Sequence, residues 1–160
     1  MKLPLKANMK MLLGVVTLAA VANAVYFLNA YHATYDLKCE SFLTHQVRQD
    51  DFSYSAMIGL DLRNNAKGTF SIEGGMRQGE KTWVLNRDVV FDYTGLHDNA
   101  FRMENIHIIK YGRDNSPDDL FDKNVLSLKD EASRVMSLGK VKNGYIVGTL
   151  RAPALTCVPH

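Results

Sequence analysis

An uncharged segment of 25 residues, Met11 to Tyr35, constrains this chain more than any other feature. Its most apolar part, residues 11–28, would form a helix about 27 Å long at 1.5 Å per residue, close to the roughly 30 Å hydrocarbon core of a bilayer. Three lysines precede the segment: Lys2, Lys6 and Lys10. By the positive-inside rule we expect a cytoplasmic tail at residues 1–10 and a transmembrane helix at residues 11–33.

Two other features of this segment allow alternatives. Ala22-Asn23-Ala24 has the small-x-small form of a signal-peptidase site, and cleavage there would release a soluble protein with an apolar, aromatic N-terminus at Val25. Asn23 and Asn29 could hydrogen-bond a neighbouring membrane helix, although one central asparagine is also tolerated in an otherwise apolar span. The length of the segment favours an uncleaved anchor.

The charges place the folded part of the chain outside the cytoplasm. All 17 acidic residues lie from Asp36 onward, so the positive net charge of +2 comes from the N-terminal tail. Ten cytoplasmic residues cannot fold into an enzyme or a DNA-binding domain. The exported part carries no basic stripe, which excludes a nucleic-acid partner. We expect one periplasmic β domain at residues 36–160.

Cys39 and Cys157 are the only cysteines of the chain. In an oxidising compartment such a pair is most simply a disulfide joining the two ends of one domain, with the first and last strands side by side. Closing this loop would stabilise the fold by about 4 to 5 kcal/mol. Two free thiols, or a bridge to a partner, are the alternatives.

Period-two alternation dominates the exported part and predicts a mainly β fold. In FSYSAMIGLDLR, Phe52 to Arg63, every second residue from Phe52 to Leu62 is apolar, and NNAKG then turns the chain into a second strand. We expect seven or eight strands in a small antiparallel β-barrel-like domain, closed or incomplete, with a sandwich as the alternative.

Three local features refine this fold. Phe101 and Met103 are out of phase with Ile106 and Ile108, and a bulge would reconcile them. SPDDLFDKNVL predicts one short helix, with Ser116 as its N-cap. Asn143-Gly144 predicts a tight hairpin near the end of the chain.

No catalytic, cofactor or metal motif appears in the sequence, so we expect a protein that is not an enzyme. Histidines could instead report acidity, since imidazole titrates between pH 5 and 8. His107 is the best candidate because its apolar neighbours predict a half-buried ring, and His45 and His97 follow it.

A small barrel can also hold an amphipathic ligand such as a bile salt. Six aromatic residues would line such a cavity if it existed, although ordinary core packing also accounts for them: Phe52, Tyr54, Phe70, Trp83, Phe91 and Tyr93.

The overall layout resembles the FidL-like inner-membrane proteins of enteric bacteria. The resemblance is carried by the basic tail, the anchor and its following cysteine, the NRDVVFDY strand, the DNSPDDL segment and the final APALTC. More broadly the layout is similar to ToxS, VtrC, PsaF and MyfF. It implies a single-pass protein of the bacterial inner membrane with a lipocalin-like periplasmic domain and the Cys39–Cys157 disulfide.

The resemblance also implies a partner. Such proteins pair with a ToxR-like, membrane-bound regulator that carries a winged-helix DNA-binding domain, and help it sense bile salt or pH to control virulence or fimbrial genes. An exposed strand edge or the anchor would supply the contact. The alternative is a membrane-tethered ligand-binding protein or export chaperone that acts without a regulator.

Overall fold

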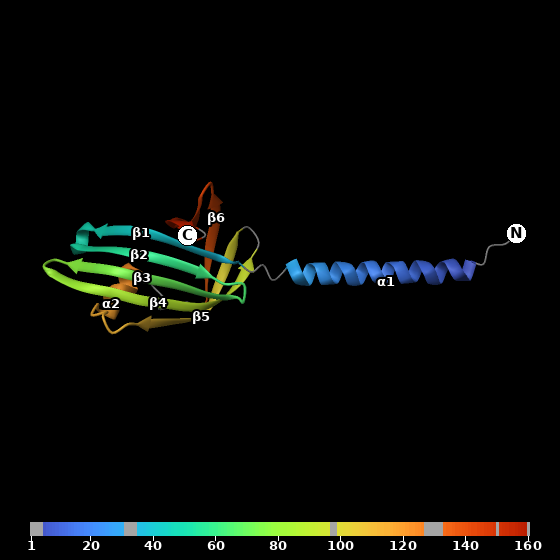
Figure 1. The fold of residues 1–160 in the computed structure, drawn as a ribbon, viewed down its shortest axis with the longest axis horizontal. Coiled ribbons are helices and arrows are strands. Elements are labelled where there is room, and N and C mark those ends of the chain that lie inside the picture. Colours follow the sequence, from blue (N-terminus) through green and yellow to red (C-terminus); the bar gives the residue numbers. More distant parts are fainter. Residues whose placement is uncertain (1–4, 31–34, 97–98, 127–132, 150, 160) are drawn as a thin grey trace. The chain divides into compact units, whose positions relative to one another are not determined.

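The computed structural model describes residues 5–30, 35–96, 99–126, 133–149 and 151–159; the side chains of residues 5–12, 26–30 and 49 are not among those described. The chain divides into two compact units, Met1–Ala33 and Thr34–His160. The first contains helix α1, and the second contains an antiparallel β-barrel with a short helix, α2 (Figure 1).

Helix α1 spans Leu5–Ala30. Within the described residues, no helix combines the length and the hydropathy that a membrane crossing requires. This finding does not support the predicted anchor at residues 11–33, which stays a prediction. Asn23 donates its side-chain amide to the Ala19 carbonyl oxygen at 2.8 Å, so its polar group is satisfied within its own helix. The side chain of Asn29 lies outside those described.

The described part of the second unit contains eight strands, each antiparallel to the next in chain order, and β8 returns to pair with β1. A barrel therefore forms, as the alternation predicted, and not the sandwich. The strands are β1 Leu37–Val47, β2 Phe52–Leu62, β3 Lys67–Gln78, β4 Lys81–Leu96, β5 Ala100–Lys110, β6 Ser133–Val141, β7 Gly144–Thr149 and β8 Pro153–Pro159.

Strand β2 shows why the alternation gives this fold. Each second residue from Phe52 to Leu62 is buried, whereas the residues between them are exposed or half-buried. The predicted turn after β2 also forms: Ala66 adopts a left-handed backbone, with φ 62°, and Arg63 and Lys67 close the turn with a 2.9 Å backbone hydrogen bond. The first hairpin is therefore confirmed.

The predicted bulge lies in β5 opposite β4. Val90 pairs with His107, and Asp92 pairs with Glu104, so two residues of β5 face one residue of β4. Asn105, one of these two, takes a left-handed backbone with φ 51°, which asparagine tolerates better than most residues. The bulge restores the inward phase of the strand and turns His107 outward.

The second predicted hairpin forms one residue earlier than expected. Val141 pairs with Gly144, so Lys142 and Asn143 are the two turn residues and Gly144 begins β7. A Cβ atom at Gly144 would lie 2.8 Å from the carbonyl oxygen of Cys157. The glycine is therefore required for close approach of β8 and not for the turn itself.

The barrel closes unevenly. The three C-terminal strands, β6 to β8, cover only the end of the sheet at which β1 begins. Strand β6 pairs with β5 only between Ala100 and Glu104. Strand β8 pairs with β1 only at Cys39 and Glu40. Figure 1 shows β6 crossing the long strands β1 to β5 steeply. Beyond this crossing, β1 to β5 continue as a curved sheet, and α2, Asp118–Asn124, packs its fully buried Phe121 into the core.

Candidate functional site

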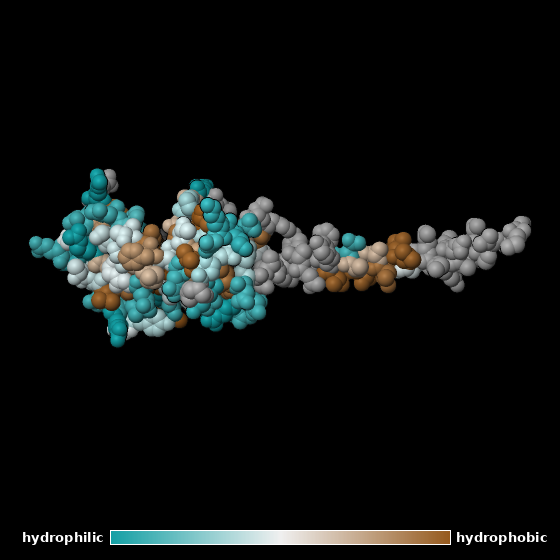
Figure 2. All heavy atoms as spheres, turned by 45° about the horizontal axis from the view of Figure 1, so that its top comes forward, coloured by the Kyte–Doolittle hydropathy of each residue, from teal (hydrophilic) through white to brown (hydrophobic). Residues whose placement is uncertain are grey.

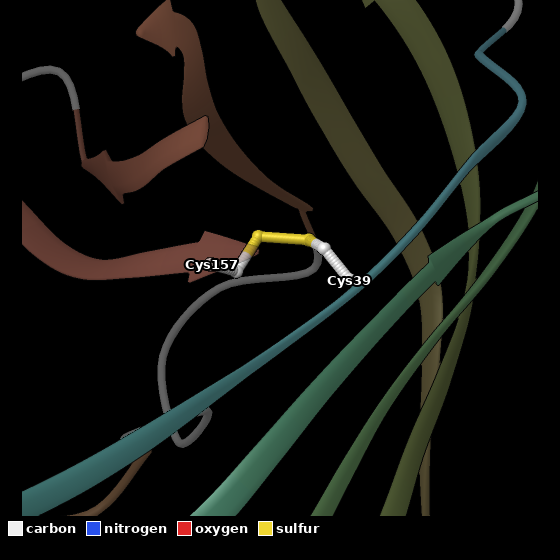
Figure 3. The surroundings of a disulfide bond; sticks show 2 residues. All are labelled: Cys39 and Cys157. Atoms are coloured by element: carbon white, nitrogen blue, oxygen red, sulfur yellow. A yellow bond between two sulfur atoms is a disulfide. The ribbon is translucent and has the colours of Figure 1, made fainter. Parts of the chain in front are cut away.

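The disulfide marks the point at which the barrel closes (Figure 3). Cys39 of β1 and Cys157 of β8 are bonded, their Cα atoms lie 5.4 Å apart, and both side chains are fully buried. Cys39 pairs with Pro159 across the two strands. The predicted intramolecular bond between the first and last strands is confirmed, and the alternatives of free thiols or a bridge to a partner do not apply.

Beyond the disulfide, β1 has one edge without a strand partner in the described part of the chain. Its seven residues from Ser41 to Val47 pair with β2 on one side, whereas β8 contacts β1 only at Cys39 and Glu40. This segment, SFLTHQV, has no Asp, Glu, Lys, Arg or Pro. Natural edge strands usually carry such residues because they block pairing with another chain. We call Ser41–Val47 the β1 edge.

The outer face of the β1 edge carries one exposed apolar pair, Phe42 and Met57, beside the polar Thr44 and Gln46. Phe42 is 68 % exposed, and Met57, directly opposite on β2, is 45 % exposed. An exposed phenylalanine on an uncharged, unpaired strand is typical of a surface that another strand covers. The two residues therefore mark this edge as the first candidate contact surface.

An apolar cavity of about 230 Å³ lies on the inner side of the same edge. Leu43 and His45 of the β1 edge line it, together with residues of the neighbouring strands and the end of α2. The remaining lining residues are Tyr54, Ile58, Phe70, Ile72, Met103, Val125, Leu126, Met136, Val147, Ala154 and Leu155. The β1 edge thus carries an exposed phenylalanine on its outer side and borders an apolar cavity on its inner side.

The six aromatic residues that the sequence suggested for a cavity divide between cavity and core. Tyr54 and Phe70 line the cavity, whereas Phe52, Trp83, Phe91 and Tyr93 do not. Phe91 instead stacks on Phe101, with ring centroids 6.2 Å apart. Ordinary core packing, the alternative considered above, therefore describes four of the six.

Tyr93 has a structural function at the start of the domain. Its hydroxyl accepts a 2.8 Å hydrogen bond from the Tyr35 backbone N–H and donates to the Arg63 carbonyl oxygen at 2.7 Å. Burial raises the pKa of Tyr93, so the phenol stays protonated and keeps its donor.

The three candidate histidines lie in different surroundings. His107 is exposed, so the predicted half-buried ring is wrong: the bulge turns it outward, and β6 does not reach this part of β5. His97 lies outside the described residues. His45 is exposed at the cavity, and its ring centroid lies 5.6 Å from that of Tyr54. His45 is therefore the described histidine that belongs to the candidate site.

Arg87 of β4 holds the segment between β5 and α2 in place. Its side chain points inward and is 2 % exposed. Its Nε donates to Asp114 at 2.8 Å, its Nη2 donates to the Ser116 hydroxyl at 2.9 Å, and its guanidinium lies 4.4 Å from the centre of the Phe121 ring. A single buried cation thus holds both the loop and α2, and the two residues after α2, Val125 and Leu126, line the cavity.

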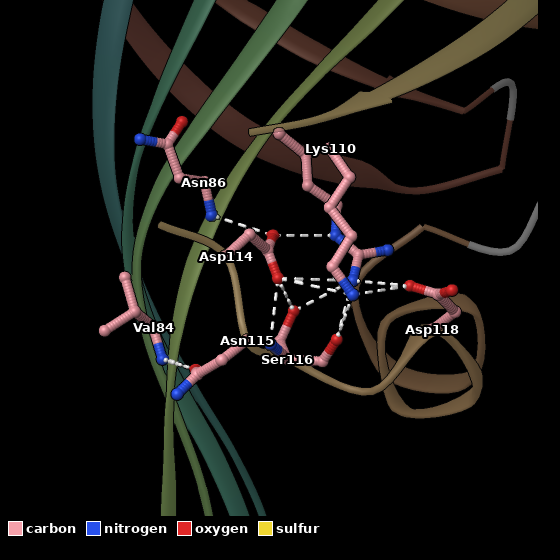
Figure 4. Close-up of polar contacts among 8 residues, drawn as sticks. Val84, Asn86, Lys110, Asp114, Asn115, Ser116 and Asp118 are labelled. Atoms are coloured by element: carbon pink, nitrogen blue, oxygen red, sulfur yellow. Dashed lines mark hydrogen bonds and ion pairs between the residues drawn. The ribbon is translucent and has the colours of Figure 1, made fainter. Parts of the chain in front are cut away.

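Asp114 completes this cluster, in which Figure 4 shows it facing Asn86, Ser116 and Lys110. Burial raises the pKa of Asp114, but hydrogen bonds from Arg87, from Ser116 and from the backbone amides of Asn86 and Ser116 outweigh burial and lower it to about 2. The carboxylate is therefore charged at neutral pH, and the pair with Arg87 is intact.

The same segment also covers the edge of β4 beyond the end of β5. Asn115 receives the Val84 N–H on its side-chain oxygen at 2.7 Å and donates its own backbone N–H to the Val84 carbonyl at 3.2 Å. Ser116 was expected to cap α2, but Pro117 occupies the cap position without a side-chain bond, and the Ser116 hydroxyl joins the Arg87 cluster instead. The polar segment therefore covers one edge, whereas none of the described strands pairs with the β1 edge.

One known family matches this chain. The family model described as "FidL-like putative membrane protein" matches residues 74–157, a little over half of the chain. The chain belongs to this FidL-like family. No curated protein matches the chain.

The FidL-like match begins within β3 and ends at Cys157 of the disulfide. It therefore includes Arg87, Asp114 and α2. The β1 edge and helix α1 precede the matched region, so their interpretation depends on this chain's own residues.

Proposed function

We propose that this FidL-like protein is a non-enzymatic, inner-membrane co-regulator. Its β domain would pair, in the periplasm, with the corresponding domain of a ToxR-like membrane regulator that carries a winged-helix DNA-binding domain. The β1 edge carries the proposal, because an uncharged strand that has no strand partner on one side among the described residues, and that carries an exposed phenylalanine, can accept a strand from a partner.

The membrane anchor is part of this proposal. The large apolar side chains of α1 between Leu13 and Val25 are 52 to 76 % exposed, which suits a lipid environment better than water (Figure 2). Lys2, Lys6 and Lys10 would keep the N-terminus in the cytoplasm. Any signal would then reach DNA through the winged-helix domain of the partner.

Pairing at the β1 edge would stabilise the regulator and place its domain beside the apolar cavity. A bile salt or a change of pH is the signal that the family resemblance suggests, with virulence or fimbrial genes as the output. The cavity supports a ligand because Leu43 and His45 of the pairing strand also line it. Binding there would therefore act on the strand that contacts the partner.

In-cell crosslinking and affinity purification from membranes test the proposal. We expect the full-length protein to recover a membrane protein with a cytoplasmic winged-helix domain, and to recover it equally after α1 is exchanged for an unrelated anchor. If no DNA-binding membrane protein is recovered, the co-regulator function is wrong. Loss of recovery upon anchor exchange alone would transfer the contact from the β1 edge to the helix.

A second function, a membrane-tethered ligand-binding protein or export chaperone, is favoured by the cavity alone. It requires no regulator and no free strand edge. To test it, purified full-length protein is mixed with each available membrane regulator. A protein that stays monomeric and still binds an apolar probe would support this second function over the co-regulator function.

A further inference from the structure

We propose that the cavity beneath the β1 edge binds one unbranched acyl chain of about eight carbons, with its carboxylate at His45. The cavity is lined by aliphatic, aromatic and thioether side chains, apart from two polar groups, the His45 imidazole and the Tyr54 hydroxyl. A site of this composition favours a ligand that is apolar along most of its length and polar at one end.

The cavity volume determines the size of the ligand. Sites for drug-sized molecules usually measure about 300 to 1,000 Å³, and this cavity is smaller, at about 230 Å³. The smaller volume favours a short, flexible chain of about eight carbons over a rigid four-ring molecule such as a bile salt, which belongs to the drug-sized class.

The lining also suits a flexible chain. Met103 is fully buried and Met136 is 7 % exposed, and unbranched thioether side chains adapt their shape to a ligand. Val147 of β7 is also fully buried, so Met103 and Val147 are the two lining residues without solvent exposure, and Met136 lies on β6 between their strands. The chain end of the ligand belongs at these three residues.

The polar end of the ligand belongs at the β1 edge. His45 is exposed and its ring contacts the Tyr54 ring, so the imidazole lies where the cavity meets solvent. A neutral imidazole has one N–H donor and a charged one has two, so His45 can donate to a carboxylate in either state. In the β1–β2 turn, the Asp50 carboxylate is paired with Lys123 at 2.6 Å, which offsets its charge.

Photolabelling of the full-length protein in lipid nanodiscs tests this assignment. The probe is decanoate with a diazirine at its chain end, competed by unlabelled straight-chain carboxylates of four to fourteen carbons. We expect label on Met103, Met136 or Val147. Because burying one methylene is worth about fourfold in affinity, competition should rise about fourfold per carbon and then level off near eight to ten carbons.

Two matched substitutions separate the cavity from general membrane partitioning. Ala154→Trp fills the mouth of the cavity, whereas Ala152→Trp adds the same bulk two residues away on an exposed position outside it. We expect labelling to fall at least tenfold in Ala154→Trp and to remain unchanged in Ala152→Trp. His45→Gln should weaken competition by decanoate more than competition by decanol.

Three results would overturn the proposal: label spread over α1 with none in the cavity, equal labelling of the two tryptophan variants, or displacement of the probe by cholate as effective as by decanoate. The proposal does not depend on a regulator. Failure to recover a partner from membranes would refute the co-regulator function and leave acyl binding intact. Failed labelling would refute acyl binding and leave the co-regulator function intact.

Discussion

Substitution of Asp114 by alanine tests whether the buried Arg87 cluster holds the loop and α2 against the barrel. The carboxylate accepts hydrogen bonds from Arg87 at 2.8 Å and from the backbone amides of Asn86 and Ser116 at 2.9 and 2.8 Å. Its removal leaves a guanidinium that is 2 % exposed with only the exposed Asp118 carboxylate, at 2.8 Å, as counter-charge. Breaking one side of a buried pair costs about 3 to 5 kcal/mol.

Urea unfolding at pH 7, followed through Trp83, measures this cost, since Trp83 is the only tryptophan of the chain. Asp119→Ala removes an exposed carboxylate from the first turn of α2 and should cost less than about 1 kcal/mol. The double variant Arg87→Met/Asp114→Leu should be more stable than Asp114→Ala, because it leaves no unpaired charge. Equal unfolding free energies for Asp114→Ala and Asp119→Ala would refute the reasoning.

Acid should weaken the same cluster. The pKa of Asp114 is lowered from an ordinary value of 3.8 to about 2. This shift corresponds to about 2 to 3 kcal/mol of stability that is fully present above pH 4 and is lost as the pH falls through 2. In Asp114→Ala this part of the acid dependence should disappear, and a wild-type acid profile in the variant would show that another group is responsible.

Three further predictions concern closure and pairing. Cys157→Ser should lower the unfolding free energy by about 4 to 5 kcal/mol under oxidising conditions, because the disulfide closes a loop with a sequence separation of 118 residues. The unfolding free energy of the variant should also be insensitive to reductant. An unchanged urea midpoint would contradict this prediction. Gly144→Ala should destabilise the barrel by about 1 to 3 kcal/mol, since its Cβ would lie 2.8 Å from the Cys157 carbonyl oxygen. Gly112→Ala is the control and should be close to neutral, because no atom lies within 4 Å of its Cβ position. Equal melting temperatures for the two variants would show that close approach does not require Gly144. Phe42→Lys should reduce recovery of the membrane partner at least tenfold, because a charge blocks strand addition. Val84→Lys, at a 48 % exposed position on β4, should leave recovery unchanged. Equal recovery in the two variants would place the contact elsewhere.

Local sequence patterns predicted much of the barrel. Alternation identified β2 and its hairpin with the first part of β3, because Phe70 and Ile72 continue the buried face of β2. Residues 74–78 were expected to be a loop but extend β3. The phase change between Met103 and Ile106 predicted the bulge, since only an extra residue keeps both on the inner side. The two cysteines predicted that the first and last strands meet, and Cys39 of β1 pairs with Pro159 at the end of β8.

The site was less predictable because it depends on where strands stop pairing. The bulge was foreseen, but nothing in the IHII sequence shows that β6 ends its pairing at Glu104, and so His107 was expected to be half-buried. His45 was foreseen only as a histidine and not as part of a cavity, since its neighbours come from strands distant in sequence. Alternation could have revealed more of β1: Leu37, Cys39, Leu43 and Val47 share one phase.

Arg87 shows the same limit. It alternates with Leu85 and Val89 on the inward face of β4, so the alternation pattern predicts that its side chain is buried. Its partners were not, because Asp114 lies 27 residues later in a segment that looked like a helix cap. Burial of a charge at an inward position is the signal that should prompt a search for such a partner.

The most direct test of the account is site-specific photocrosslinking in living cells. A photoreactive phenylalanine analogue replaces Phe42 on the β1 edge or, as the control, Val84 on the outer face of β4. The account predicts a crosslink from position 42 to the periplasmic domain of a membrane-bound winged-helix regulator, and none from position 84. Crosslinks to that regulator from both positions alike, or from neither, would contradict pairing through the β1 edge.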